Sequence, residues 1–354
     1  MMQSDRQTIV AVWLLTICAI LFAMVLIGGV TRLTGSGLSM VEWEPITGVL
    51  PPLNQEQWTR VFELYQQFPE YKVKNVGMSL DGFKSIFWLE YAHRILGRLI
   101  GFIFFLPLLF FVVTGRVSKS LVPKLVLLFV LGGLQGLLGW YMVKSGLVHD
   151  PHVSQYRLTA HLGFALLIYG YMLWIALDLL FPTRKETGAK GRQKGRSARV
   201  VFAWAITLLV FVTALSGGLV AGTRAGFAYS TFPTMAGQWI PSGLFVLDPL
   251  WRNFFENLTT IQFDHRVLAT LLFIVILVFW LTTRDIAAPR RLRIGIHLLL
   301  VAVCVQVTLG ISTLLLVVPI ALAAAHQGGA VLLLTASLFV LHQAHLTRLG
   351  TQSG

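Results

Sequence analysis

Four of the nine histidines stand at matched places in the two parts of the chain, and imidazole is a side chain that binds iron. Imidazoles from two facing helices can hold a haem iron, while the flat macrocycle fills the apolar space between the helices. We therefore predict two bis-histidine sites, one formed by His93 and His161 and the other by His265 and His326. Unrelated hydrogen-bonded histidines are the alternative. Zinc or copper fits less well, because no cysteine or carboxylate set completes a coordination sphere.

A carboxylate distinguishes the first site from the second. Glu90 lies three residues before His93 and therefore on the same helix face, whereas Gln262 has the matching place before His265. A site that performs chemistry can use a carboxylate for proton transfer or to stabilise positive charge. The alternative explanations are local: Glu90 would be a favourable acid in a first helical turn, and Gln262 would form a capping box with Thr259. The sequence thus predicts similar ligation but different reactivity in the two sites.

Three arginines accompany these histidines inside the apolar stretches. Arg94 and Arg266 directly follow His93 and His265. Their guanidinium groups suit pairing with the propionate groups of a haem. The alternative is that they snorkel to the outer membrane interface. Arg98 lies one turn deeper, where snorkelling explains it less well.

The composition places these residues in a membrane protein. Hydrophobic residues make up 56% of the 354 and charged residues only 12%, with a mean hydropathy of +0.74. A soluble domain carries about a quarter charged residues. The apolar residues form runs long enough to cross roughly 30 Å of hydrocarbon as helices. We expect eight spans, at about residues 9–30, 91–114, 122–143, 157–181, 199–222, 263–283, 293–317 and 320–342.

The net charge of +13 does not indicate a nucleic-acid partner, because Lys and Arg lie mainly in short loops between the apolar runs. Grouped by alternate sides of the membrane, sixteen lie on the side of both termini and nine on the other. The excess of positive charge predicts that both termini are cytoplasmic and that the long loops 31–90 and 223–262 face outward. Cys18 and Cys304 lie in apolar runs, so no structural disulfide is expected.

The chain reads as two similar halves. We expect an N-terminal half at 1–182 with the first histidine pair, a flexible basic cytoplasmic linker at 183–199, and a C-terminal half at 200–354 with the second histidine pair. Four segments of the first half resemble segments of the second, in the same order: 26–37 and 215–226, 90–102 and 262–274, 134–140 and 305–311, 157–167 and 321–333. The predicted fold class is an all-α integral membrane protein, with eight transmembrane helices arranged as two parallel-repeat four-helix bundles.

The first outer loop contains a predicted amphipathic helix. Asn54 and Gln57 fit a capping box, and apolar residues then share one face: Trp58, Val61, Phe62 and Tyr65. We interpret it as a helix on the bilayer surface, with a lid over a site as the alternative.

The remaining histidines give weaker signals. His149 and His152 form an HDPH motif in an outer loop, where we expect solvated side chains, with a transient metal site as the alternative. The other three are interpreted as interfacial residues near the cytoplasmic side: His297, His342 and His345.

Over nearly all its length the chain resembles the haem A synthases of aerobic bacteria and mitochondria. The resemblance is carried by GGVTRLTGSGLSMVEWEPITGVLPP (28–52), EYAHRILGR (90–98), GLQGLLGWYMVKSGL (133–147), VSQYRLTAHL (153–162), YSTFPTMAGQWIP (229–241), FDHRVLA (263–269) and AAHQ (324–327). The outer loops lack the cysteine pair of one branch, so the chain is closer to the branch with the mitochondrial enzymes. The family usually has Asn where Ser230 stands, and the role of that loop does not carry over directly.

The resemblance implies oxidation of a ring methyl of haem O to the formyl group of haem A, for cytochrome c oxidase. Successive hydroxylations would give a geminal diol that loses water to the aldehyde. The resemblance also implies that His265 and His326 hold a haem b cofactor. It implies that His93 and His161 bind the substrate haem, with Glu90 essential beside it. For a bacterial chain the location would be the cytoplasmic (inner) membrane.

The expected partners are haem O, the enzyme that produces haem O, an electron donor of unidentified kind, and membrane lipid. A homo-oligomer is left open. Two rival functions are a di-haem b-type electron-transfer cytochrome and a parallel-repeat transporter. The cytochrome leaves the contrast of Glu90 with Gln262 as an accident. The transporter would place its ionisable groups near the middle of the membrane, whereas here they cluster outward.

Overall fold

The computed structural model describes residues 2–42, 49–148, 151–182, 193–284 and 288–349. Eight of the helices in these ranges are long and apolar enough to cross a membrane, as predicted. They are α1 (Met2–Leu33), α4 (Leu80–Val113), α5 (Val122–Lys144), α6 (Gln155–Leu180), α7 (Gln193–Thr223), α9 (Leu258–Thr283), α10 (Arg290–Leu315) and α11 (Ile320–Leu349). Short helices occur in the two long loops: α2 (Gln55–Gln66), α3 (Pro69–Val73), η1 (Ala225–Phe227), η2 (Leu250–Arg252) and α8 (Asn253–Glu256).

Several helices extend beyond the predicted spans, most of all α4 at its start. Helix α4 begins at Leu80 rather than near residue 91, because the Ser79 side chain caps it by accepting from the Gly82 amide at 3.2 Å. Helix α7 begins at Gln193, so residues 193–199 of the expected flexible linker are helical. Residues 183–192 of that linker lie outside the described residues.

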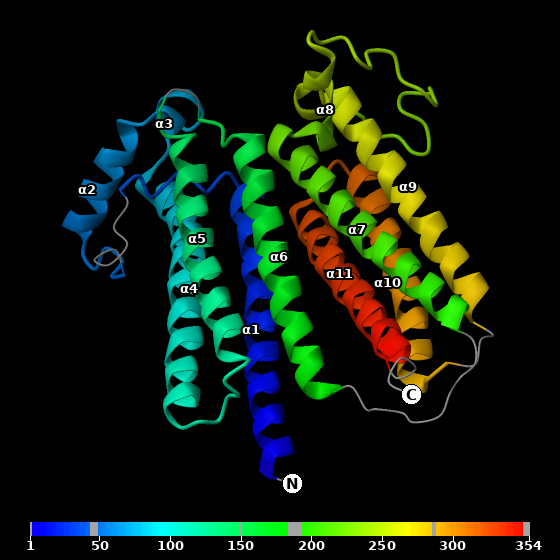
Figure 1. Cartoon of the computed structure of the whole chain (residues 1–354). Coiled ribbons are helices and arrows are strands. Elements are labelled where there is room, and N and C mark those ends of the chain that lie inside the picture. The colour runs from blue at the N-terminus through cyan, green and yellow to red at the C-terminus, as the bar shows by residue number, and fades with distance from the viewer. Residues whose placement is uncertain (1, 43–48, 149–150, 183–192, 285–287, 350–354) are drawn as a thin grey trace. The chain divides into compact units, whose positions relative to one another are not determined.

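The chain forms two compact units. The smaller unit contains residues 19–165, and the larger unit contains residues 1–18 and 166–354. In the larger unit α7, α9, α10 and α11 pack in a closed cycle, each against two of the others, which makes a four-helix bundle (Figure 1). In the smaller unit α4 packs against α5 and also carries α2.

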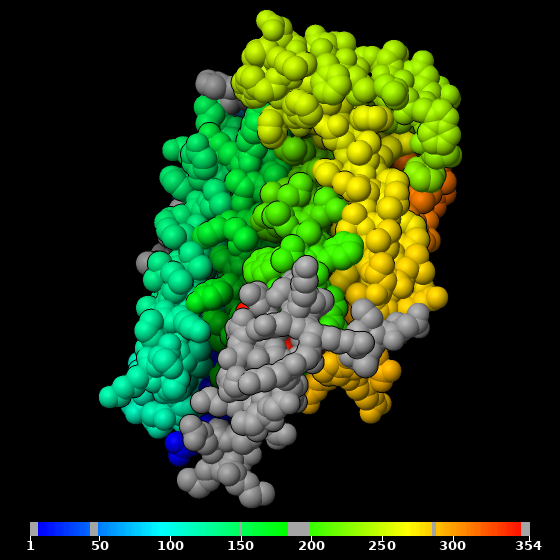
Figure 2. Space-filling view, turned by 45° about the vertical axis from the view of Figure 1, so that its right-hand side comes forward, coloured from blue at the N-terminus to red at the C-terminus, as the bar shows by residue number. Residues whose placement is uncertain are grey.

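The outer surface of α9 shows why this bundle needs a membrane. Large apolar side chains at helical spacing are roughly half exposed along one face: Val267, Leu271, Ile274, Val278 and Leu281. Helix α9 lies at the surface along its length in Figure 2, where it is coloured yellow. Its opposite face is buried in the bundle, with Ile276 and Phe279 almost fully covered. An apolar stripe of this length is stable at a surface only where lipid covers it.

The predicted helix of the first outer loop is present as α2. Asn54 caps it by accepting from the Gln57 amide at 2.9 Å. Its apolar face packs against α4, not against lipid: Trp58 meets Phe87 at 4.9 Å and Tyr65 meets Phe83 at 5.0 Å between ring centroids. The interpretation as a bilayer-surface helix was wrong. The early start of α4 supplies the partner that the sequence analysis did not foresee.

A carboxylate is buried beneath α2. Glu70 is only 4% exposed and accepts a hydrogen bond from the Tyr65 hydroxyl at 3.1 Å, while Asn75 donates to the same hydroxyl at 2.7 Å. Burial raises the pKa of Glu70 to about 7, although the hydrogen bond from Tyr65 opposes the shift. The folded protein therefore holds a proton on this residue at pH values where the unfolded chain has released it.

This proton makes stability fall as pH rises. Between the ordinary carboxyl pKa of about 4.3 and about 7, the folded state binds more protons than the unfolded state, so unfolding becomes easier with each step up in pH. Glu70→Gln retains an acceptor for Tyr65 and should remove this dependence. We expect Glu70→Gln to gain up to about 3 kcal/mol over wild type between pH 5 and 8, measured by thermal unfolding. Glu63→Gln, at an exposed glutamate, is the control and should keep the wild-type pH dependence. If the stability of Glu70→Gln fell with pH in parallel with wild type, Glu70 would not be the group responsible.

Candidate functional site

Each of the four predicted ligand histidines packs against a glycine of a neighbouring helix. A methyl group built on the glycine would lie 2.8–3.3 Å from Cε1 of the imidazole, too close for an ordinary contact. The pairs are Gly28 with His93, Gly139 with His161, Gly217 with His265, and Gly310 with His326. All four glycines fall in the repeated segments 26–37, 134–140, 215–226 and 305–311, so the repeats reflect a shared structural device. The sequence analysis did not single out these glycines, although their matched positions were available as a signal.

Two glycines of α5 provide a direct test of this contact. Gly132 has no atom within 4 Å of a built methyl group, whereas the methyl of Gly139 would lie 2.9 Å from His161. Gly132→Ala should leave stability unchanged or raise it by up to about 1 kcal/mol, because alanine favours the helix. Gly139→Ala should lower it by about 1–3 kcal/mol through overpacking. Thermal unfolding compares the two, and equal effects would show that the ring is not closely packed.

A glutamine of α5 or α10 holds the second histidine of each pair. Nε2 of Gln135 donates to the His161 carbonyl oxygen at 2.9 Å, and Nε2 of Gln306 donates to the His326 carbonyl oxygen at 2.9 Å. Each glutamine lies four residues before the glycine that touches the same ring, and so on the same helix face. These two residues were also missed by the sequence analysis, and again the repeat is the signal that would have found them.

His265 and His326 are close enough to share one metal. Their ring centroids are 6.4 Å apart and the ring planes are perpendicular. A metal between the rings would lie about 2 Å from one nitrogen of each imidazole. Adding the distance from that nitrogen to the ring centroid, for both rings, gives about the observed separation of the centroids. Nδ1 of His326 is buried without a hydrogen-bond partner in the described structure. The pair therefore fits an iron held between two imidazoles.

His93 and His161 lie together in the smaller unit. They belong to α4 and α6, and both fall within residues 19–165. Both rings are packed against glycines, as in the other pair.

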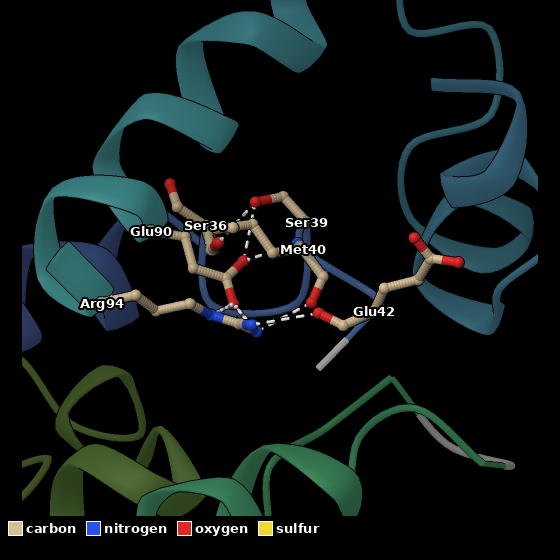
Figure 3. A network of polar contacts seen from close by, with 6 residues as sticks. All are labelled: Ser36, Ser39, Met40, Glu42, Glu90 and Arg94. Carbon is tan, nitrogen blue, oxygen red and sulfur yellow. Dashed lines mark hydrogen bonds and ion pairs between the residues drawn. The ribbon is translucent and has the colours of Figure 1, made fainter. Parts of the chain in front are cut away.

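Glu90 lies at the centre of a polar network between α4 and the segment that follows α1 (Figure 3). It is 3% exposed. Its Oε2 accepts from the Ser39 hydroxyl at 2.7 Å and from the Met40 amide at 2.8 Å. Its Oε1 accepts from Nη2 of Arg94 at 2.6 Å and from Nε at 3.0 Å. A carboxylate with four donors and little solvent contact is held in one orientation.

Arg94 joins the same network rather than extending to the membrane surface. Its Nη2 also donates to the Met40 carbonyl at 2.7 Å, and its Nη1 to the Glu42 carbonyl at 3.3 Å. The side chain is only 12% exposed, so the snorkelling interpretation was wrong for this residue. Arg98 is half-buried one turn further along α4.

In the larger unit the amide of Gln262 has the place of the Glu90 carboxylate, and Arg266 has the place of Arg94. Nε2 of Gln262 donates to the Tyr229 carbonyl at 3.0 Å, and Nη1 of Arg266 donates to the Thr231 carbonyl at 2.8 Å. The capping-box explanation of Gln262 was wrong, because α9 is capped by Asn257. In both units the residue three before the histidine and the arginine after it hold the preceding outer segment. Only Glu90 brings a carboxylate to that place.

The other histidines are placed as follows. His149 lies outside the described residues, and His152 is exposed. The interfacial interpretation was wrong for His342, which is 1% exposed and lies 3.0 Å from a carboxylate oxygen of Asp178. His297 is exposed and accepts from the Trp280 indole at 2.9 Å.

The described structure defines a class: α-helical membrane proteins of eight spans that carry two repeat-related pairs of intramembrane histidines. The chain belongs to the COX15-CtaA family, whose model, described as "Cytochrome oxidase assembly protein", matches residues 11–338.

Curated relatives cover nearly the whole chain. A protein of Nitrosospira multiformis named "Heme A synthase" is 56% identical over 337 residues, covering 95% of this chain and 94% of its own length. A protein of the same name from Nitrosomonas eutropha is 53% identical, with 94% and 92% covered. The human protein named "Heme A synthase COX15" is 46% identical, with 95% and 83% covered. The resemblance read from the motifs is thus confirmed at the level of the family.

Proposed function

We propose that this chain is a haem A synthase, which oxidises a ring methyl of haem O to the formyl group of haem A. The observation that carries the proposal is the contrast between two similar histidine pairs, of which only one has a buried, fully hydrogen-bonded carboxylate beside it. Two sites of equal ligation but unequal reactivity suit an enzyme with one substrate haem and one resident haem. The names of the relatives, at 46–56% identity, support the same activity.

The substrate site is assigned to the smaller unit. His93 and His161 would bind the iron of haem O and so fix the ring, and Glu90 would stand beside the reacting methyl as the catalytic carboxylate. Its four hydrogen-bond donors hold it in one orientation, and a carboxylate so placed suits stabilisation of positive charge or acceptance of a proton during oxidation. Two hydroxylations of the methyl, each needing an oxygen atom and a two-electron oxidant from outside the chain, would give the geminal diol, which would lose water to give the aldehyde.

The cofactor site is assigned to the larger unit. His265 and His326 would hold a haem b, which their separation and perpendicular planes fit. When bound, this group supplies one-electron transfer. The chain's own contribution is to fix both imidazoles with glycine contacts and to exclude water with the apolar bundle.

Arg94, Arg98 and Arg266 are assigned as charge partners of the haem propionates. Arg94 and Arg266 already anchor outer segments through backbone carbonyls, and Nε of Arg266 is buried without a hydrogen-bond partner among the described residues. The N-terminal half at 1–182 and the C-terminal half at 200–354 remain the proposed functional division. The enzyme that produces haem O, an electron donor and a second copy of the chain remain proposed partners.

Pigment analysis of the purified protein tests the function. Expressed in a host that makes haem O, the protein should yield haem A together with haem B on extraction. Haem B alone would instead favour a di-haem electron-transfer cytochrome, and a colourless protein would favour a transporter.

We also propose that the chain lies in the bacterial inner membrane with both termini in the cytoplasm. The bias of Lys and Arg supports this orientation. A reporter fusion within 184–199 should be active only as a cytoplasmic reporter. Activity of a periplasmic reporter at the same place would reverse the orientation.

A further inference from the structure

His265 has a side-chain partner on the neighbouring helix. The Ser216 hydroxyl of α7 lies 2.8 Å from Nδ1 of His265. The next residue, Gly217, touches Cε1 of the same ring, so the two helices approach closely enough for the hydroxyl to reach the imidazole. Two adjacent residues therefore make the contact. Gly217 has no side chain and lets the helices approach, and Ser216 supplies the hydroxyl oxygen.

The direction of this hydrogen bond follows from a second one. Ser216 also lies 2.8 Å from the Thr213 carbonyl oxygen, to which only the serine can donate. A hydroxyl has one proton, so its oxygen is left to accept from Nδ1–H of His265. The ring is then held with Nδ1 protonated and Nε2 bare, the form in which Nε2 can bind a metal.

The first half of the chain differs at this position. Segments 26–37 and 215–226 align so that Gly28 matches Gly217, and both glycines touch the imidazole of their own unit. In that register Ile27 matches Ser216. An isoleucine side chain has no acceptor for an imidazole N–H.

The other histidine of each pair differs in another way, because Nε2 of Gln135 lies 3.2 Å from Nδ1 of His161 whereas Nδ1 of His326 has no hydrogen-bond partner among the described residues. Gln135 and Gln306 make the same hydrogen bond to the backbone of His161 and His326, at 2.9 Å in both units. Among the four rings in the described structure, that of His265 is the one within hydrogen-bond distance of a side-chain oxygen, the hydroxyl of Ser216.

We propose that Ser216 is a positioning residue that makes the second site a permanent one. By accepting from Nδ1–H it fixes the tautomer and orientation of His265 and increases electron donation from the ring to a bound iron. Ile27 leaves His93 without this support, which suits a ligand whose haem must enter and leave. The inference rests on the proposed role of His265 as a haem ligand.

The test uses the purified full-length protein and three variants. Ser216→Ala removes the acceptor, Ser216→Thr restores a hydroxyl, and Thr207→Val is the matched control. Thr207 is a buried residue of the same helix whose hydroxyl donates to the Ala203 carbonyl at 2.9 Å. The rate of haem b loss is measured as transfer of the haem to an apo-globin scavenger. The ferrous fraction is measured by redox titration.

Ser216→Ala should still purify with haem b but should lose it roughly 10- to 100-fold faster than wild type. At a fixed solution potential its ferrous fraction should rise, because weaker donation stabilises ferric iron less. Ser216→Thr should return both measurements toward wild type, and Thr207→Val should change neither. A structural role alone would not shift the redox titration.

Two outcomes separate the failure of this inference from the failure of the proposed function. If His265→Ala removes haem b while Ser216→Ala leaves the loss rate and the titration unchanged, the role of Ser216 is wrong and the ligand assignment stands. If His265→Ala retains haem b with an unchanged spectrum, the ligand assignment itself is wrong, and the inference falls with it.

Discussion

Glu90→Gln is expected to abolish haem A formation while leaving a folded protein with both histidine pairs intact. The amide oxygen can still accept from Ser39 and Met40, and Arg94 retains its bonds to the Met40 and Glu42 carbonyls. The second half shows that glutamine is tolerated here, since Gln262 holds its outer segment from the matching position. The negative charge is lost, and with it any proton transfer, and the amide nitrogen that replaces Oε1 can no longer accept from Arg94. Removing such a group lowers rates by roughly 100- to 10,000-fold.

Glu90→Ala provides the contrast. It removes the acceptor as well as the charge, so the Ser39 hydroxyl, the Met40 amide and the Arg94 guanidinium lose a buried partner. Both variants break the buried ion pair, which costs about 3–5 kcal/mol. Only alanine also leaves the Ser39 hydroxyl and the Met40 amide without an acceptor, so this variant should unfold at lower temperature than Glu90→Gln. The measurements are the ratio of haem A to haem O in membranes and the thermal midpoint of the purified proteins. Normal haem A formation by Glu90→Gln would show that the carboxylate serves structure alone.

The membrane spans could be predicted from the sequence, because twenty apolar residues in a row have few other stable arrangements. The start of α4 could not, because Leu80 lies outside the apolar run and its helix depends on a cap from Ser79 and on aromatic packing against α2. The aromatic contacts, of Trp58 with Phe87 and of Tyr65 with Phe83, join residues that are far apart in the sequence. Periodicity within one segment contains no information about them.

The candidate site, like the fold, could be predicted only in part from the sequence. The four histidines and Glu90 were found because their residue types are expensive in a membrane and because two of the segments repeat. Their partners were missed, because a glycine or a glutamine in an apolar run has many ordinary explanations. The contact of Gly310 with His326 depends on how close two helices lie, which side-chain packing decides. Likewise, the burial of His342 follows from its pairing with Asp178 on another helix.

His265→Ala and His326→Ala should each remove the resident haem b from the purified protein. A bis-histidine iron that loses one of two protein ligands is held only by the remaining imidazole and by apolar contacts. The alanine also opens a gap beside Gly217 or Gly310, which water can enter. We expect the b-type absorbance of the reduced protein to fall by most of its amplitude, as measured by a reduced-minus-oxidised spectrum.

Two controls make this result specific. His297→Ala changes an exposed histidine that accepts from the Trp280 indole, and it should retain the full b-type spectrum. His93→Ala should lose binding of haem O and production of haem A but keep the resident haem, because the two histidine pairs lie in separate compact units. If His265→Ala kept an unchanged spectrum while His93→Ala lost it, the assignment of substrate and cofactor to the two sites would have to be reversed.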